Sequence, residues 1–547
     1  MAYFKDKVVY QIYPKSFYDS NHDGVGDIRG ITQKLDYLKH LGVDYLWLTP
    51  VFPSPQKDNG YDVADYCAID SLFGNMKDLE ELIAKAGENG IGIMLDMVFN
   101  HTSTAHIWFQ KALAGEEKYQ NYYIFKEGDK NTPPTNWQSK FGGSAWQYEE
   151  TLGKWYLHLF DISQADLNWD NPEVREELKN VVRFWKNKGI KGFRFDVVNL
   201  ISKPATFADD ESGDGRRFYT DGPNVHEYIK ELVRDTQIED MVTVGEMSST
   251  TLENCIRYSN PAERELSMCF NFHHLKVDYK NGNKWELMPA DTMALKSLFE
   301  HWQVGMQEGS GWNALFWCNH DQPRIVSRLG SEDKYHKESA KMLATMIHLM
   351  RGTPYIYQGE EIGMTNPNYK NITQYLDVES LNYYRILLAE GKSEEDALSI
   401  LAARSRDNSR TPMQWSDETN AGFSKGTPWM ALSDNYSQIN VENSLKENDS
   451  IYAYYKHLIS LRKQMPIISE GTISFFEKDN PHVLCYERHH EGKSLIVINN
   501  LLGTETSIQG NETWQSAEKI LGNYSHDISL RSGVLHLAPY ESLALLR

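Results

Sequence analysis

Cysteine is scarce in this sequence, which has 5 cysteines among 547 residues. The cysteines are Cys67, Cys255, Cys269, Cys318 and Cys485. Their number is odd, and no two of them have the Cys-x-x-Cys spacing that is typical of zinc sites and redox motifs. The sequence therefore indicates neither a disulfide framework nor a structural zinc site, and we expect reduced thiols that are mostly buried.

Long apolar segments are also missing. The N-terminal stretch MAYFKDKVVYQIYP has no apolar run after a basic start. No run of about 18 apolar residues, the length needed to cross a membrane, occurs elsewhere. The sequence thus predicts neither a secretory leader nor a membrane-spanning helix, and we expect a cytoplasmic protein that acts as a monomer.

Positive charge is in deficit. The chain has 56 Lys and Arg against 76 Asp and Glu, which gives a formal net charge of −20. Nucleic acids and anionic membranes are bound through a basic face, so we expect neither of them as a partner. A small anionic substrate would need a local basic pocket.

Short apolar runs, in contrast, are frequent, and helical patterns such as that of residues 31–42 separate them. The runs cover residues 8–14, 45–51, 91–99, 192–198, 242–247, 268–273, 314–321 and 354–363. Continuous apolar runs without alternation are typical of parallel strands that are buried on both faces. Eight such strands separated by helices predict an α/β fold, the (β/α)8 TIM barrel.

The spacing of these runs predicts further domains. The gap after the third run predicts a loop-rich, aromatic inserted subdomain over residues 102–172, which leaves residues 1–101 and 173–474 for the catalytic barrel. A second excursion, at about residues 365–425, follows the eighth run. Residues 475–547 show short alternating segments, which predict a C-terminal antiparallel β-sandwich.

Acidic residues stand at the ends of the predicted strands, on the face where barrel enzymes build their active sites. Asp196 and Glu246 end neighbouring strands, and such a pair is the minimum equipment for cleaving a glycosidic bond. Arg194 points to the same side of its strand as Asp196, and it can keep that carboxylate ionised. Asp321 is a third acid. Taken singly, each acid could instead cap a helix.

Four segments in this order, DMVFNH (96–101), GFRFDVV (192–198), VGEM (244–247) and CNHDQ (318–322), resemble the signature regions of the α-amylase family of glycoside hydrolases. DNGYD (58–62) and DNSRTPMQW (407–415) resemble its α-glucosidase and oligo-1,6-glucosidase branch. The resemblance implies a retaining mechanism with Asp196 as nucleophile, Glu246 as acid and base, and Asp321 as transition-state stabiliser. It also implies a glucose subsite formed by Tyr61, Asp62, His101, Arg194, His320 and Arg410.

Three further segments, HLFDISQADLNW (158–169), GEMSSTT (245–251) and FHHLKVDY (272–279), are similar to trehalose-6-phosphate hydrolases. Within the last of them, His273, His274 and Lys276 follow the sixth strand, where cations could meet a phosphate. They could equally be packed histidines and a solvated lysine. We therefore expect hydrolysis of trehalose 6-phosphate, with an oligo-1,6-glucosidase or a binding protein without catalysis as alternatives.

The loop DSNHDGVGD (19–27) resembles the start of a calcium-binding loop. An EF-hand would carry Glu at its twelfth position, which is Gly30 here, so a calcium switch is not indicated. The oxygen ligands of a structural Ca²⁺, or of Mg²⁺, would come from Asp19, Asn21, Asp23, Val25 and Asp27. The alternative is a loop of Asx turns without an ion. We expect no organic cofactor.

Overall fold

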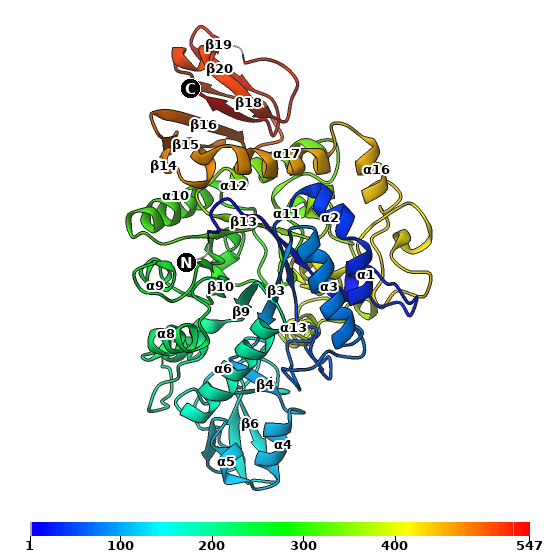
Figure 1. The fold of residues 1–547 in the computed structure, drawn as a ribbon, viewed down its shortest axis with the longest axis vertical. Coiled ribbons are helices and arrows are strands. Elements are labelled where there is room, and N and C mark those ends of the chain that lie inside the picture. The colour runs from blue at the N-terminus through cyan, green and yellow to red at the C-terminus, as the bar shows by residue number, and fades with distance from the viewer. Residues whose placement is uncertain (1–2, 212, 529) are drawn as a thin grey trace.

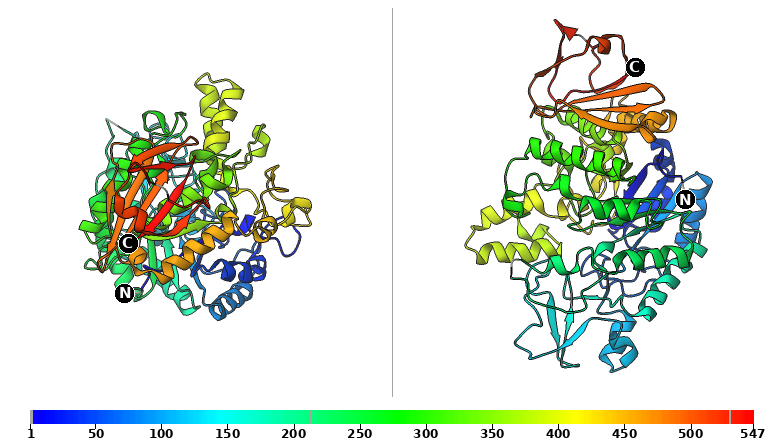
Figure 2. Two further views of the ribbon diagram at one scale, coloured as in Figure 1. Left: turned by 90° about the horizontal axis from the view of Figure 1, so that it is seen from above. Right: turned by 90° about the vertical axis from the view of Figure 1, so that its left-hand side faces the viewer.

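The computed structural model describes residues 3–211, 213–528 and 530–547. Residues 1–2 and 212, within the predicted barrel, and residue 529, within the predicted C-terminal domain, lie outside the described residues. Three bodies follow one another along the long axis of the molecule (Figure 1). The C-terminal sheets form one end, the barrel forms the middle, and the inserted segment, coloured cyan, forms the other end, as a view from the side also shows (Figure 2).

A parallel sheet of 8 strands forms the middle body, in the order β11-β10-β9-β3-β2-β1-β13-β12. The strands are β1 (Val9–Ile12), β2 (Tyr45–Leu48), β3 (Gly92–Met97), β9 (Gly192–Phe195), β10 (Val242–Glu246), β11 (Met268–Phe270), β12 (Ala314–Leu315) and β13 (Thr353–Tyr357). A parallel bridge between Cys269 and Asn313 joins the two edges of the sheet and closes it. The predicted (β/α)8 barrel is confirmed.

The predicted apolar runs each overlap one barrel strand, but they extend beyond the strands at the C-terminal ends. The run 314–321 contains the strand Ala314–Leu315, which has only 2 residues. The next residues, Phe316, Trp317 and Cys318, are buried without being part of a strand. An apolar run therefore indicates burial more reliably than it indicates strand length.

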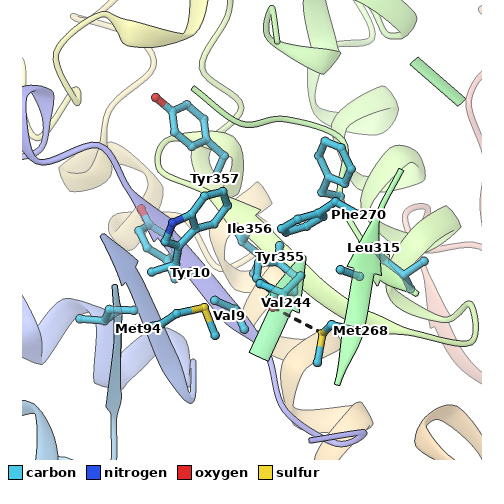
Figure 3. Close-up of a cluster of buried hydrophobic side chains, with 14 of the residues drawn as sticks. Val9, Tyr10, Met94, Val244, Met268, Phe270, Leu315, Tyr355, Ile356 and Tyr357 are labelled. Atoms are coloured by element: carbon cyan, nitrogen blue, oxygen red, sulfur yellow. Dashed lines mark hydrogen bonds between the residues drawn. The ribbon is translucent and has the colours of Figure 1, made fainter. Parts of the chain in front are cut away.

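Large side chains fill the inside of the barrel. In Figure 3, Val9, Val244, Met268 and Tyr355 come from different strands and lie close together. The rings of Phe270 and Tyr355 meet edge to face with their centroids 4.6 Å apart, a favourable aromatic geometry. The hydroxyl of Tyr355 donates to the sulfur of Met268 over 3.4 Å. This packed interior supports the mouth of the barrel from below.

Helices surround the barrel, and their ends carry recognisable caps. The main ones are α1 (Ile28–Gln33), α2 (Leu35–Leu41), α3 (Met76–Glu88), α6 (Pro172–Asn187), α8 (Val225–Thr236), α9 (Leu252–Ser259), α10 (Thr292–Glu308), α11 (Ile325–Leu329), α12 (His336–His348), α17 (Ile451–Gln464) and α18 (Pro466–Ser469). Asn171 caps α6, which has Pro172 at its first position, where a missing N–H costs nothing. Asn75 and Asp78 form a capping box on α3.

The inserted segment contains more regular structure than its loop-rich sequence suggested. It consists of β4 (His101–Ser103), α4 (Ile107–Leu113), α5 (Glu117–Gln120), β5 (Phe125–Glu127), β6 (Trp146–Glu149), β7 (Lys154–Leu157) and β8 (Gln164–Asp166). Strands β4 and β8 form one sheet, and β5, β7 and β6 form another. Buried Lys203 joins this segment to the barrel, because its Nζ lies 2.8 Å from Asp166 Oδ2 and 2.7 Å from Asn100 Oδ1. The insertion is therefore fixed against the mouth of the barrel.

Two more segments complete the fold. Helices α13 (Val378–Ala389), α14 (Glu394–Arg404), α15 (Asp407–Arg410) and α16 (Val441–Lys446) follow β13, and α7 (Arg216–Tyr219) lies in the loop after β9. The C-terminal sheets contain β14 (Thr472–Phe476), β15 (Val483–His490), β16 (Lys493–Asn500), β21 (Ser542–Leu546) and β18 (Glu518–Gly522) in one, and β17 (Thr506–Gln509), β20 (Val534–Leu537) and β19 (Leu530–Arg531) in the other. Side chains of both sheets share one buried cluster, so the predicted antiparallel sandwich is confirmed.

Candidate active site

A cavity of about 230 Å³ lies at the C-terminal ends of the barrel strands. Two sets of charged side chains line it. The acidic wall consists of Asp58, Asp196, Glu246 and Asp321. The basic wall consists of Lys140, Lys276 and Lys284. Tyr61, His101, Glu379 and Arg406 also line the cavity. The sequence-predicted acids Asp196, Glu246 and Asp321 are thus brought together, although three different strands lead to them.

Arg194 holds the acidic wall together. Its Nη1 lies 2.6 Å from Asp96 Oδ1 and 2.6 Å from Asp196 Oδ1, and its Nη2 contacts Glu246 Oε2. The side chain of Arg194 is 1% exposed, so these ion pairs are formed almost without water. Burial raises the pKa of Asp96 to about 7, although Arg194 opposes that shift. One guanidinium therefore fixes the positions of both Asp196 and Glu246.

The backbone after Asp196 is strained. Val197 has a φ of 34°, in the left-handed region that β-branched residues avoid. The amide of Asp196 donates to the carbonyl of Met97 over 3.0 Å, and the chain turns directly into the 3-10 helix Val198–Leu200. Strain of this kind persists where the surrounding structure imposes it, and it often accompanies function. Here the turn places the Asp196 carboxylate at the cavity.

Asp321 stands in a strongly positive environment. Its Oδ1 accepts from Arg410 Nη2 over 2.8 Å and from Arg406 Nη1 over 3.4 Å. Its Oδ2 lies 3.2 Å from His320 Nε2. Burial would raise the pKa of Asp321, but the permanently charged Arg406 and Arg410 hold it well below its usual range. Asp321 is therefore an ionised carboxylate next to Asp196 and Glu246 in the cavity lining.

The rings of Tyr61 and His101 line the cavity beside these acids, whereas the predicted subsite residue His320 is fully buried behind Tyr61. The rings of Tyr61 and His320 stack with centroids 4.9 Å apart and planes inclined by 2°. The hydroxyl of Tyr61 donates to Asp96 Oδ2 over 2.9 Å. His101 Nε2 lies 3.1 Å from the carbonyl oxygen of Tyr61. Burial lowers the pKa of His320 to about 3, so its ring is neutral near pH 7. The flat ring of Tyr61 at the cavity suits one face of a sugar ring.

Asp62 does not line the cavity, and this position is corrected. Its carboxylate accepts from the hydroxyl of Ser54 over 2.8 Å and from the amides of Lys57 and Asp58, so it shapes the loop from within. Asp58, four residues earlier in the same DNGYD segment, lines the cavity instead. The DNGYD motif correctly indicated this part of the site, but the sequence could not show which of its two aspartates faces the cavity, inward from the loop.

Sequence reasoning also missed Arg406. Its guanidinium lies 2.9 Å from Asp58 Oδ1 and 3.4 Å from Asp321 Oδ1, and it stacks over the ring of Phe141 at 4.7 Å. The segment RSRDNSR contains several arginines, and only Arg410 was selected from it. Both Arg406 and Arg410 form ion pairs with Asp321, so two guanidinium groups hold this carboxylate of the acidic wall.

The two predicted histidines do not reach the cavity, and this expectation is corrected as well. His274 Nε2 lies 2.9 Å from the carbonyl oxygen of Phe316, inside the protein. The ring of His273 packs on Trp302 with centroids 4.9 Å apart. Burial lowers the pKa of each histidine to about 4, so both are neutral near pH 7. They are packing residues, which was the alternative that the sequence left open.

Lys276, the third predicted cation, does line the cavity, together with two lysines that the sequence did not single out. No ion pair of Lys276 is found within the part of the chain that the structure describes. Lys140 Nζ donates to Ser248 Oγ over 3.2 Å, and burial lowers the pKa of Lys140 to about 7. Lys284 Nζ lies 2.6 Å from Glu379 Oε2. The basic wall thus has two lysines without an acidic partner in contact and one that is paired.

The loop of residues 19–27 is held by hydrogen bonds from backbone amides to aspartate side chains. Asp19 accepts from the amides of Asn21, His22 and Gly24, and Asp27 caps α1 through the amide of Gly30. Over residues 3–211, 213–528 and 530–547, no group of three or more His, Cys, Asp or Glu side chains is placed so that it could hold a metal ion. The ligand chemistry of the loop, oxygen donors only, nevertheless suits Ca²⁺.

Comparison with known proteins agrees with this architecture. Residues 11–471 match the model of the alpha amylase catalytic domain, and residues 483–543 match that of the alpha-amylase SusG C-terminal domain. The chain therefore belongs to the α-amylase family of glycoside hydrolases. In the described parts of the chain, no helix combines the length and apolar character that a membrane span requires.

Within that family the chain is similar to trehalose-6-phosphate hydrolases and to oligo-1,6-glucosidases. It is 52% identical to the trehalose-6-phosphate hydrolase of Bacillus subtilis (strain 168), over 99% of this chain and 97% of the relative. It is 53% identical to that of Escherichia coli (strain K12), over 99% and 98%. The crystal structure of Bacillus licheniformis trehalose-6-phosphate hydrolase superimposes with a TM-score of 0.95 at 53% identity, covering 100% of both chains. An oligo-1,6-glucosidase of Parageobacillus thermoglucosidasius is 45% identical over 99% of this chain and 98% of the relative.

Proposed function

We propose that this protein hydrolyses trehalose 6-phosphate to glucose and glucose 6-phosphate. One observation carries the proposal: a single cavity combines the three candidate catalytic acids, Asp196, Glu246 and Asp321, with three lysines. The acidic wall suits cleavage of a glycosidic bond. The basic wall, in a chain of net charge −20, suits an anionic group on the substrate. The similarity to trehalose-6-phosphate hydrolases supports the same substrate.

The chemistry follows from the acidic wall. In the first step a carboxylate oxygen of Asp196 attacks the anomeric carbon, while Glu246 donates its proton to the bridging oxygen. The bond between that carbon and oxygen breaks, and glucose 6-phosphate leaves. In the second step Glu246 takes a proton from water, which attacks the same carbon and releases glucose from Asp196 with net retention. The contacts of both acids with Arg194 support the short separation, about 5 Å, that this mechanism requires.

Asp321 contributes charge rather than protons. Positive charge develops on the sugar in the transition state, and an ionised carboxylate in the same cavity stabilises it. Burial alone would raise the pKa of Asp321, but Arg406 and Arg410 hold it well below its usual range. Asp321 therefore stays negative throughout the working pH range. It is suited to this role and not to that of a proton donor.

The phosphate is assigned to the basic wall. Lys276 and Lys140 would bind it directly, since neither contacts a carboxylate among the described residues. Lys284 would contribute after its pairing with Glu379 adjusts. Because sugar phosphates are made and consumed inside cells, we also propose that the protein acts in the cytoplasm.

The test is a substrate panel. The purified protein is assayed with trehalose 6-phosphate, isomaltose and panose at matched concentrations. We expect kcat/KM for trehalose 6-phosphate to exceed the other two values by at least about tenfold, since each charge-assisted hydrogen bond to phosphate contributes about 1.5–3 kcal/mol. A higher value for isomaltose or panose would instead support an oligo-1,6-glucosidase, a reading that the 45% identical relative keeps open.

A second experiment separates an enzyme from a binding protein. Asp196→Asn removes the attacking oxygen but keeps the size of the side chain. The parent should turn over trehalose 6-phosphate, and the variant should bind the sugar without releasing glucose. Equal inactivity of the two proteins, with binding retained in both, would favour a non-catalytic role.

We also propose that a structural Ca²⁺ binds the loop of residues 19–27. Asp19, Asp23 and Asp27 carry negative charge that no lysine or arginine in contact offsets within the described part of the chain. Asn21 and the carbonyl of Val25 supply neutral oxygens of the kind that Ca²⁺ accepts. Chelator should lower the melting temperature, and Ca²⁺ should restore it better than Mg²⁺. Loss of turnover at an unchanged melting temperature would contradict this structural role.

A further inference from the structure

A chain of charged groups connects the basic wall of the cavity to Asp321. Lys284 Nζ lies 2.6 Å from Glu379 Oε2, and the same oxygen lies 3.5 Å from Arg406 Nε. Arg406 Nη1 in turn lies 3.4 Å from Asp321 Oδ1. The side chains of Glu379 and Arg406 are 10% and 7% exposed. At this degree of burial, neighbouring charges act on one another with little screening by water.

One oxygen of Glu379 is therefore shared between two cations. The contact with Lys284 is short, at 2.6 Å, and the contact with Arg406 is longer, at 3.5 Å. Arg406 in turn divides its charge among several carboxylates, of which Asp377 at 2.5 Å and Asp58 at 2.9 Å are the nearest. These ion pairs are coupled because they share charged groups. If Lys284 interacts less strongly with Glu379, Glu379 interacts more strongly with Arg406. The ion pair between Arg406 and Asp321 then becomes weaker.

We propose that Glu379 is a positioning residue that couples the occupant of the basic wall to Asp321 through Arg406. This inference rests on the proposed function, because the occupant is the phosphate group of the substrate. When the phosphate dianion approaches Lys284, it competes with Glu379 for the ammonium group. Glu379 then interacts more strongly with Arg406. As a result, the positive charge of Arg406 offsets less of the negative charge of Asp321. Asp321 becomes a stronger stabiliser of the developing positive charge on the sugar.

The coupling should affect kcat, whereas phosphate binding alone should affect only KM. Direct phosphate contacts by Lys276 and Lys140 are the same in the ground state and the transition state, and such uniform binding lowers KM without raising kcat. The relay through Glu379 acts on the chemical step, so it raises kcat. A phosphorylated substrate should then react faster than trehalose even when both saturate the enzyme.

The experiment measures kcat and KM separately for trehalose 6-phosphate and trehalose in the full-length parent, Glu379→Gln and Lys276→Met. For the parent we expect the kcat ratio of the two substrates to be about fivefold or more, the lower range of known couplings between sites. Glu379→Gln should bring this ratio close to 1 and change the KM for trehalose 6-phosphate much less. The matched control Lys276→Met should raise that KM and keep the kcat ratio. A parental kcat ratio that survives in Glu379→Gln would overturn the proposal.

A second measurement begins with the parent protein, so its first result does not depend on whether a variant folds. Methyl α-glucoside has a small leaving group, which keeps the basic wall accessible to free phosphite dianion. Phosphite should raise the kcat of the parent for methyl α-glucoside about fivefold, and this activation should disappear in Lys284→Gln. No activation by saturating phosphite contradicts the coupling. If the parent hydrolyses isomaltose but not trehalose 6-phosphate, the proposed function fails, whereas phosphite activation still decides the coupling separately.

Discussion

The acidic and the basic wall of the cavity differ in how their side chains are held. On the acidic wall, Arg194 contacts Asp96, Asp196 and Glu246, and Arg410 contacts Asp321. On the basic wall, Lys276 stays exposed, Lys140 donates to the hydroxyl of Ser248 and lies over the ring of Tyr219, and Lys284 pairs with Glu379. The comparison indicates that the groups assigned to bond cleavage are fixed before substrate arrives. Of the groups assigned to substrate choice, Lys140 and Lys276 contact no carboxylate among the described residues.

The largest effect is expected when the support of the acidic wall is removed. Arg194→Met leaves Asp96, Asp196 and Glu246 as buried acids without their shared cation. Breaking a buried ion pair on one side costs about 3–5 kcal/mol of the free energy of unfolding. We expect kcat to fall by at least about 100-fold for trehalose 6-phosphate and trehalose alike, measured beside the melting temperature. A loss confined to the phosphorylated substrate would contradict the division between the walls.

A smaller and more selective effect is expected on the basic wall. Lys276→Met removes one cation and keeps the aliphatic stem. We expect kcat/KM for trehalose 6-phosphate to fall about tenfold to 100-fold, the value of a charge-assisted hydrogen bond. The value for trehalose should change far less, since it carries no anion. Steady-state kinetics with both sugars measure the effect, and equal losses for the two would show that Lys276 supports the fold of the cavity instead.

The pH dependence should distinguish the substrates as well. Burial, followed by repulsion from Arg216, lowers the pKa of Lys140 to about 7. The ammonium is therefore charged below that pH and becomes neutral above it. The second ionisation of a phosphate group lies at about 6, so the complementary charges coexist between about pH 6 and 7. We expect KM for trehalose 6-phosphate to rise several-fold from pH 6.5 to 8.5, and Lys140→Met should remove this rise.

The smallest effect is expected at His273. Its ring packs on Trp302, and burial lowers its pKa to about 4, so it offers no positive charge near pH 7. His273→Gln should change the kcat/KM ratio of trehalose 6-phosphate to trehalose by less than about twofold, as expected for a residue outside the binding contacts. A tenfold fall in that ratio would show that His273 contributes to binding the phosphate after all.

Sequence reasoning succeeded where residues follow directly from strand ends. Asp196 and Glu246 were placed correctly at the cavity because the period of two in a strand and the common mouth of parallel strands determine where such residues point. Arg194 was found for the same reason. The barrel strands were recognised from continuous apolar runs, although these runs continue beyond the C-terminal ends of the strands in the structure.

The basic wall was less predictable because separate parts of the chain form it. Lys140 comes from the inserted segment, Lys276 follows β11, and Lys284 lies further along the same loop. No local pattern shows that these lysines meet in space. The choice of Asp62 over Asp58 failed for a related reason, since the turn between them decides which carboxylate faces inward.

The claim that the basic wall selects the substrate can be tested directly with the variant Lys140→Met/Lys276→Met. The measurement is kcat/KM for trehalose 6-phosphate divided by that for trehalose, in the parent and the variant. The account predicts a large parental ratio that falls by at least about 100-fold in the double variant, since two charge-assisted contacts are lost, while trehalose is still hydrolysed. A ratio that stays at the parental value would contradict it.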